Sequence, residues 1–337
     1  MAQVLRIGDA DEGLLAVVAG EAREAVRGGV PAAIRFARTL GDRSVLPGSG
    51  GTADSLSVLA TVAAADLTVA RVVEPHLDAL AILDQAGEAP AAGGYGVYAA
   101  ERPGLEPVRA DGGTLTGTKP WCSLAGGLDR ALITAVERGQ RRLFDVDLHA
   151  EGVHAVPGMW VSRGLVAVDS GDLRLDGVPA TPVGEAGWYL ARPGFAWGGI
   201  GVAACWYGGA AGLATALIAA ASRRTPDQIG LAAIGEADRL LWAARGALEG
   251  AAARIDRGRA TGEAGALLAA RVRGVVADAA ERVLVLVGRA LGPAPLTFDE
   301  DHARRVADLT VYLRQHHAER DDARAGEALL SAGGTWG

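Results

Sequence analysis

The segment Leu115-Thr-Gly-Thr-Lys-Pro-Trp-Cys-Ser123 decides the fold of this chain. Its first residues alternate between apolar and polar side chains, which is typical of a β-strand, and a proline then separates the strand from a tryptophan and a serine. Three further stretches share this period of two and are predicted strands, namely Gly94–Ala99, Ala131–Ala135 and Arg142–Val146. The sequence therefore predicts a compact β domain over residues 91–190.

Turn residues divide this block into strands. Arg138-Gly-Gln140 is typical of the turn of a hairpin, because glycine accepts the backbone angles that a tight turn requires. Asp169–Val178 is expected to add a strand pair that ends before Pro179.

On both sides of the β block the period changes from two towards 3.6, which indicates helices. Residues 1–90 predict an N-terminal helical domain, shortened and interrupted by the loop Leu46–Gly51. Residues 191–330 predict a C-terminal helical bundle, in which Gly292-Pro293 ends one helix and a final helix runs through Leu313. The predicted fold class is α+β and mostly α.

Composition excludes several classes of function. The formal net charge is −7, and all 33 basic residues except Lys119 are arginines, so nothing predicts a nucleic-acid partner. The two cysteines, Cys122 and Cys205, form neither a disulfide framework nor a CxxC pair. His149 and His154 lack the acidic or cysteine neighbours of a metal site, so no bound metal is expected.

Two segments bear on location. Met1–Asp9 has no basic stretch followed by an apolar one, so a signal peptide is not expected, and the protein is predicted to be cytoplasmic. Pro193–Ser222 is uncharged and long enough to span a bilayer, but its many glycines dilute its hydrophobicity. We therefore expect a buried, close-packed helix there, and no membrane partner.

The order of helices, β domain and helices, taken with Leu115–Ser123, resembles the acyl-CoA dehydrogenase family. That segment is similar to the family pattern NGxKxWIT/S, and Asp176–Pro179 with Val183–Gly187 is similar to the family's exit from the β domain. The resemblance covers about residues 55–320. It implies an N-terminal helical domain, a small middle β-barrel or sandwich and a C-terminal four-helix bundle.

The same resemblance implies FAD as the cofactor. In the family, the Trp of this motif borders the flavin and the hydroxyl two residues later hydrogen-bonds near flavin N5. The residues that match the family's FAD contacts are Trp121, Cys122 and Ser123, Ala99 and Ala100 of the flavin loop, Arg223 of the RxxFG motif and Gly292 of the QxxGG motif. The loop has lost its threonine, RxxFG its phenylalanine and QxxGG its glutamine.

The resemblance departs most at the catalytic base. The family's glutamate, which removes the α proton of an acyl thioester, aligns with His316, and the alternative position used by some branches falls near Val202. An imidazole with an ordinary pKa near 6.5 is competent around neutral pH. His316 is therefore the predicted catalytic residue.

What the resemblance implies for function has three forms. The first is an FAD-dependent oxidoreductase that acts on an acyl-CoA or a related small molecule. The second is a monooxygenase of the same fold that receives reduced flavin from a reductase partner, where a histidine assists the oxygen chemistry. The third is a non-catalytic partner subunit. In each form the family pattern implies a homodimer or homotetramer.

Overall fold

The computed structural model describes residues 3–331 and 333–335. Met1 and Ala2, the first two residues of the segment considered above as a signal peptide, lie outside the described residues. The N-terminal helices are α1 (Glu12–Gly41), α2 (Thr52–Ala65) and α3 (Leu67–Ala86). The Asp66 carboxylate accepts a hydrogen bond from the Val69 N–H at 2.9 Å and so begins α3. The apolar run of residues 55–83 is therefore two helices.

The β domain is a small barrel. Its strands are β1 (Tyr95–Tyr98), β2 (Arg109–Asp111), β3 (Thr114–Lys119), β4 (Arg130–Glu137), β5 (Gln140–Asp147), β6 (Val153–Ala155) and β7 (Leu173–Val183). Strands β4, β2, β3, β7 and β5 are hydrogen-bonded in that order, and β5 pairs again with β4, which closes the ring. The predicted hairpin is present, since Arg138 and Gly139 turn between β4 and β5 with φ values of 51° and 82°.

One strand prediction is wrong. Asp169–Val178 does not form a strand pair before Pro179, because β7 is a single strand that continues through Pro179 to Val183. Up to Pro179 this strand pairs with β3, and from Ala180 it pairs with β5. Proline has no N–H for a ladder hydrogen bond, and here it sits where the strand changes partner.

The C-terminal part is helical. It contains α4 (Trp188–Ala191), α5 (Pro193–Arg223), α6 (Gln228–Asp256), α7 (Gly262–Leu291), α8 (Ala294–Phe298), α9 (Glu300–Tyr312) and α10 (Glu319–Ser331). Helix α5 is long and apolar enough to cross a membrane, but 72% of its most apolar window is buried inside the protein. Its glycines allow close packing, since a Cβ at Gly208 would lie 2.1 Å from the carbonyl oxygen of Ala60 on α2.

The end of the chain differs from the prediction. Helix α9 ends at Tyr312, Leu313–Gln315 forms one turn of 3-10 helix, and α10 follows. His316 therefore lies after the end of α9, in a loop of extended backbone. Glu319 begins α10, where a carboxylate interacts favourably with the helix dipole.

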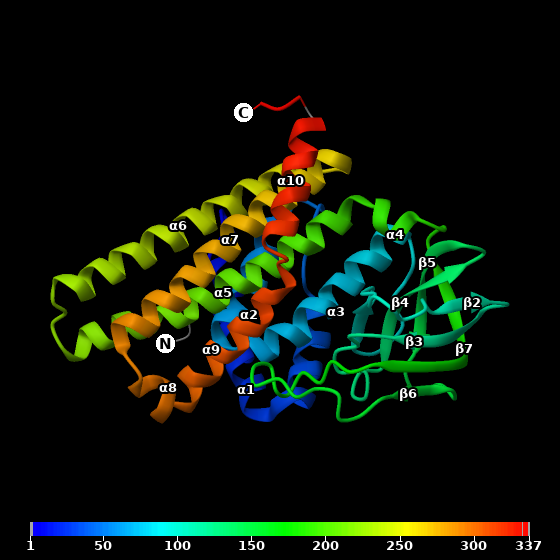
Figure 1. The fold of residues 1–337 in the computed structure, drawn as a ribbon, viewed down its shortest axis with the longest axis horizontal. Coiled ribbons are helices and arrows are strands. Elements are labelled where there is room, and N and C mark those ends of the chain that lie inside the picture. The colour runs from blue at the N-terminus through cyan, green and yellow to red at the C-terminus, as the bar shows by residue number, and fades with distance from the viewer. Residues whose placement is uncertain (1–2, 332, 336–337) are drawn as a thin grey trace.

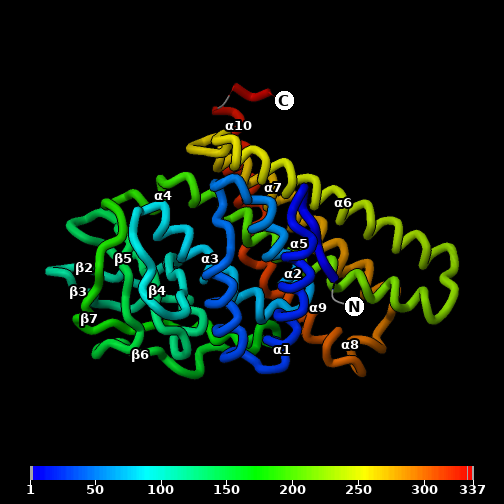
Figure 2. Tube along the Cα trace, turned by 180° about the vertical axis from the view of Figure 1, so that it is seen from behind, coloured from blue at the N-terminus to red at the C-terminus, as the bar shows by residue number. Residues whose placement is uncertain are grey.

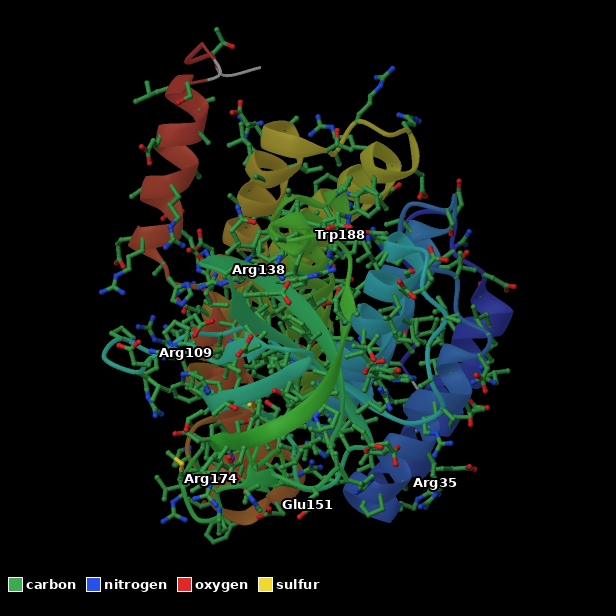
Figure 3. The ribbon with its side chains drawn as sticks, turned by 90° about the vertical axis from the view of Figure 1, so that its right-hand side faces the viewer. Arg35, Arg109, Arg138, Glu151, Arg174 and Trp188 are labelled. Atoms are coloured by element: carbon green, nitrogen blue, oxygen red, sulfur yellow. The ribbon has the colours of Figure 1, made fainter. Side chains whose placement is uncertain are left out.

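The two ends of the molecule differ in structure (Figure 1; Figure 2). The β domain lies at one end, α6 and α7 extend to the other, and α1–α3 lie between them. Seen from the β-domain end, Arg109, Arg138 and Arg174 lie at the periphery of the barrel (Figure 3). The side of the barrel that faces α3 and α9 forms the site described next.

Candidate active site

The main cavity lies where α3, the β domain and the end of α9 meet, and its volume is about 800 Å³. Its walls are α3, strand β1 with the loop after it, the loops of residues 120–128 and 156–172, and the segment 311–317. This volume lies within the usual range for small-molecule sites.

The loop after β3 has an unusual backbone. Trp121 and Leu124 have φ values of 61° and 60°, in the left-handed region that is unfavourable for residues other than glycine. The Cys122 N–H donates to the Gly171 carbonyl at 2.8 Å, and the Leu124 N–H donates to the Asp169 carbonyl at 2.6 Å, which holds the loop in place. Trp121 remains 55% exposed and lines the cavity. Backbone strain of this kind concentrates at functional sites.

Ser123 is the centre of a polar cluster in the cavity wall. Its hydroxyl oxygen lies 2.8 Å from the Ser170 hydroxyl and accepts a hydrogen bond from Arg71 Nη2 at 3.4 Å. The Tyr98 hydroxyl donates to the Ser123 carbonyl at 2.9 Å. Groups from two segments therefore hold the Ser123 hydroxyl at the cavity wall, and a third segment holds its backbone.

Lys119, the only lysine of the chain, fixes another wall of the cavity. It is fully buried, and its Nζ donates to Glu101 Oε1 at 2.8 Å and to the Thr134 hydroxyl at 2.8 Å. Arg102 makes two hydrogen bonds with the Asp172 carboxylate, at 2.7 and 3.0 Å. The loop after β1, which contributes Glu101 to the cavity, is thus held from both sides.

The loop of residues 156–172 joins the β domain to α9. Gly164 packs tightly on this helix, since a Cβ there would lie 2.0 Å from the Ala307 carbonyl oxygen. The Leu165 N–H donates to the carboxylate of Asp308, and burial raises the pKa of Asp308. The loop therefore forms a wall that is anchored to the helical part of the protein.

Arg71 and Tyr312 line the main cavity, and the buried carboxyl of Glu74 lies behind them. Glu74 Oε2 accepts a hydrogen bond from Arg71 Nη1 at 2.6 Å and lies 3.5 Å from the Tyr312 hydroxyl. Burial raises the pKa of Glu74 to about 7, although the charge of Arg71 opposes this shift. This carboxyl can therefore take up or release a proton near neutral pH.

A second cavity of about 530 Å³ lies between α3, α5, α7 and α10. Gln315 and His317 line both cavities, and Glu74 lines the second. Arg273 holds the loop between the cavities, because its guanidinium donates to the Gly199 carbonyl at 3.0 Å and to the Gln315 carbonyl at 2.8 Å. The two cavities are thus neighbours across one short segment.

Comparison of the sequence alone finds nothing similar: no protein-family model and no curated protein matches it. Comparison of the structure with solved structures finds similar proteins. TdsC from Paenibacillus sp. A11-2, solved with FMN and indole, superposes with a TM-score of 0.79 at 19% identity, over 96% of this chain and 98% of that chain. A steroid ACAD, Tcur3481–Tcur3483, superposes with a TM-score of 0.74 at 18% identity, over 96% of this chain and 99% of that chain. This chain has the acyl-CoA dehydrogenase fold.

The acyl-CoA dehydrogenase fold predicted from the sequence is thereby confirmed. KijD3, solved with FMN and a dTDP-linked amino-keto sugar, shares it with a TM-score of 0.76 at 19% identity, over 96% of this chain and 93% of that chain. At these identities the comparisons show the fold alone.

Within the acyl-CoA dehydrogenase fold, three of the predicted cofactor residues come together. Ala100, Trp121 and Ser123 all line the main cavity. Ala99 packs instead against a hydrophobic cluster between α3 and the barrel. The Cys122 side chain is buried, with its Sγ 3.3 Å from the Lys119 carbonyl oxygen, and burial strongly raises its pKa. The parts of Ala99 and Cys122 in cofactor binding stay predictions.

His316 lies close to the cavities, but its ring packs edge-on against Trp206, with centroids 6.2 Å apart. The residues that line the two cavities include His317 and not His316. The catalytic role of His316 stays a prediction, and His317 is the imidazole that faces both cavities.

Arg223 and Gly292 lie elsewhere in the acyl-CoA dehydrogenase fold. Arg223 is the last residue of α5, and Gly292, with a φ of 67°, caps the end of α7. Figure 1 shows the turns after these two helices at the end of the bundle opposite the β domain. The parts of Arg223 and Gly292 in cofactor binding stay predictions.

The sequence analysis missed several residues of the site. Arg71 and Glu74 share one face of α3 with apolar side chains, and a pair of charges on such a face is a signal that the sequence contains. Tyr98 and Tyr312 carry no local signal of this kind. Among the described residues, no three His, Cys, Asp or Glu side chains are arranged to hold a metal ion.

Proposed function

We propose that this protein is a flavin-dependent oxidoreductase whose main cavity holds the flavin ring. One observation carries the proposal: Trp121 and Ser123 stand together at the cavity on a loop that is held in a strained conformation. An exposed indole offers a flat apolar surface for a heterocycle, and the fixed hydroxyl offers a hydrogen bond to a ring nitrogen.

The residues present fit a flavin. The cavity of about 800 Å³ is large enough for the ring system and part of its side chain. When bound, the flavin would supply the redox chemistry by accepting or donating a hydride equivalent. Arg71 and Ser123 would bind and orient it, and the loop of residues 156–172 would keep water from the site.

Among the reactions of this fold, we favour a monooxygenase. The segment 313–318, where the resemblance places a catalytic glutamate, carries the imidazoles of His316 and His317 and no carboxylate. TdsC is described as a dibenzothiophene monooxygenase, and both TdsC and KijD3 were solved with FMN. A protein of this kind receives reduced flavin from a reductase partner, and the substrate is a small molecule.

Dehydrogenation of an acyl thioester is the second candidate, and Glu74 favours it. This carboxyl lines the second cavity, and its pKa of about 7 suits proton abstraction near neutral pH. A dehydrogenase loaded with flavin is bleached by an acyl-CoA without oxygen, whereas a monooxygenase consumes oxygen only when a reductase supplies reduced flavin.

Titration with FMN and with FAD, followed by flavin fluorescence, tests the cofactor. The sequence favours FAD, so tighter binding of FMN would correct that expectation. Trp121→Ala should weaken flavin binding about tenfold or more, because the indole forms the flat wall. Val17→Ala on α1 is the control, since Val17 is 51% exposed against 55% for Trp121. Unchanged affinity in Trp121→Ala would remove the proposed flavin site. Location in the cytoplasm and assembly into a homo-oligomer remain part of the proposal.

A further inference from the structure

We propose that the second cavity binds a small molecule through a hydrogen-bond-donating group, an amine or a hydroxyl, that reaches the carboxylate of Asp78. The inference deepens the proposed function, because it takes this cavity as the substrate pocket beside the flavin. It rests on the proposed function only for that role, and the binding itself can be tested separately.

One carboxylate oxygen of Asp78, Oδ2, accepts no hydrogen bond from the described residues. Its carboxylate lines the second cavity, and its side chain is 21% exposed. Its nearest cation is Arg192, whose Nη2 lies 3.6 Å from Asp78 Oδ1, beyond hydrogen-bond distance. Arg192 is thus the ion-pair partner of Oδ1, and among residues 3–331 and 333–335 no side chain or N–H donates a hydrogen bond to Oδ2. Arg192 instead donates from Nη1 to Gln85 Oε1 at 3.0 Å.

Glu74 lies one helical turn before Asp78, so both carboxyl groups stand on the same face of α3. Both line the second cavity. Only Oε2 of Glu74 is engaged by Arg71 and Tyr312. A ligand in this cavity therefore meets two carboxyl groups on one wall.

Helix α5 leaves space for the Asp78 side chain. A Cβ at Gly198 would lie 2.9 Å from Asp78 Oδ1, so no larger residue fits at this position without moving the carboxylate. The next residue, Gly199, is less restricted, because its Cβ would lie 3.5 Å from Arg273 Cδ. Glycine at position 198 thus leaves room for the Asp78 carboxylate at the wall of the cavity.

By surface the rest of the cavity is mostly apolar, although Arg192, Arg273 and Arg324 also line it. Its other walls include Phe195, Val202 and Leu267, with Ala325 and Ala328 of α10 covering it. An unbranched alkyl chain would fill this space but would strip water from Asp78 and leave its Oδ2 without a hydrogen-bond donor, which is costly. A compact apolar body with one donor group satisfies both parts of the wall.

The second cavity adjoins the main cavity, so a ligand bound there would lie next to the proposed flavin site. Gln315 and His317 separate it from the main cavity and line both. A molecule held at Asp78 therefore lies within one residue layer of the proposed flavin ring.

A matched set of cyclohexyl probes tests the inference on the full-length protein. Cyclohexylmethylamine, cyclohexylmethanol, the methyl ether of that alcohol and cyclohexanecarboxylate share one ring and differ in the polar group. Ligand-observed NMR titration gives the affinity of each for the wild type, Asp78→Asn, Asp78→Leu and the control Asp84→Asn, an exposed aspartate on the same helix.

We expect the amine and the alcohol to bind at least about tenfold more tightly than the ether and the carboxylate, and Asp78→Leu to lose this advantage. Asp78→Asn keeps an acceptor oxygen without the charge, so a loss for the amine alone identifies a cationic ligand, and a loss for neither identifies a neutral hydroxyl. Asp84→Asn should bind all four as the wild type does. Equal binding of the ether or tighter binding of the carboxylate would overturn the proposal, as would unchanged binding in Asp78→Leu.

Circular dichroism and flavin titration on the same variants keep the outcomes separate. A variant that retains its helical signal and its flavin affinity but loses the amine or alcohol supports the Asp78 site. If the probes bind at Asp78 but no variant, including the wild type, binds flavin, the proposed function fails and the binding site stands.

Discussion

One guanidinium, that of Arg71, ties the Ser123 hydroxyl of the β domain to the Glu74 carboxylate of α3. Nη2 lies 3.4 Å from Ser123 Oγ, and Nη1 lies 2.6 Å from Glu74 Oε2. The helical part and the barrel therefore share a polar contact at the wall of the main cavity.

Arg71→Ala should lower the free energy of unfolding by about 3 kcal/mol at pH 8, because it leaves the buried Glu74 carboxylate without its partner. Urea denaturation measures this loss. The double variant Arg71→Ala, Glu74→Gln should recover part of it, since no buried charge then remains unpaired. A double variant no more stable than Arg71→Ala alone would contradict the pairing.

Glu74 should make stability depend on pH. Its pKa is about 7 in the folded protein, against an ordinary value of 4.5, so the folded state holds the proton more tightly. The stabilisation by protonated Glu74 is complete below pH 4.5 and is lost as the pH rises to about 7. His76 acts in the opposite sense, because burial lowers its pKa to about 4 from 6.5 and its contribution grows as the pH rises through this window.

Comparison with Glu74→Gln isolates the carboxyl from the histidine. From pH 5 to pH 8 the wild type should lose on the order of 2 to 3 kcal/mol relative to this variant. Urea unfolding at the two pH values gives the difference. The exposed Glu88→Gln should show no such change relative to the wild type. A flat difference for Glu74→Gln would mean that Glu74 is ionised at both pH values.

The two histidines after the 3-10 turn should behave differently. His317→Ala should weaken the binding of flavin or of the cyclohexyl probes several-fold, because His317 lines both cavities. His316→Ala should instead cost about 1 kcal/mol of stability through lost packing on Trp206, with binding little changed. Titration and urea unfolding of both variants distinguish the residues. The reverse pattern would restore His316 as the catalytic candidate.

Two glycines of the bundle should respond oppositely to alanine. Gly208→Ala places a Cβ 2.1 Å from the Ala60 carbonyl oxygen and should destabilise by about 1 to 3 kcal/mol, because α5 must move away from α2. Gly246→Ala on α6 meets no atom within 4 Å and should stabilise by about 1 kcal/mol. Thermal or urea unfolding measures both. If both variants changed the free energy of unfolding equally, Gly208 would not lie at the contact between α2 and α5.

Assembly should depend on exposed apolar side chains of α6 and α8. Trp242 on α6 is 68% exposed and Phe298 on α8 is 89% exposed, and large exposed apolar side chains mark protein contacts. Light scattering should give the mass of more than one chain, and Trp242→Glu with Phe298→Asp should lower it. Leu190→Glu near the β domain, 45% exposed in the wild type, should not. A single-chain mass for the wild type would contradict the homo-oligomer.

The sequence by itself determined the elements and one wall of the site. Period-two and 3.6-residue patterns are set by near neighbours, so strands β1, β3, β4 and β5, the hairpin at Arg138 and Gly139, and the long helices could be predicted. The motif at Trp121 and Ser123 could be found because its residues are contiguous. The prediction missed the three-residue strands β2 and β6, and it failed at β7, where Pro179 marks a change of strand partner and not an end.

Only the tertiary structure decided what surrounds that motif. Arg71 meets Ser123 across 52 residues, and Tyr312 meets Glu74 across 238. No local pattern encodes such a meeting, because it depends on how α3, the barrel and α9 pack. The packing also turned His317 towards the cavities and His316 towards Trp206. Local periodicity fixes which residues form each element, whereas the burial of polar groups at the contacts between elements fixes which side chains make the site.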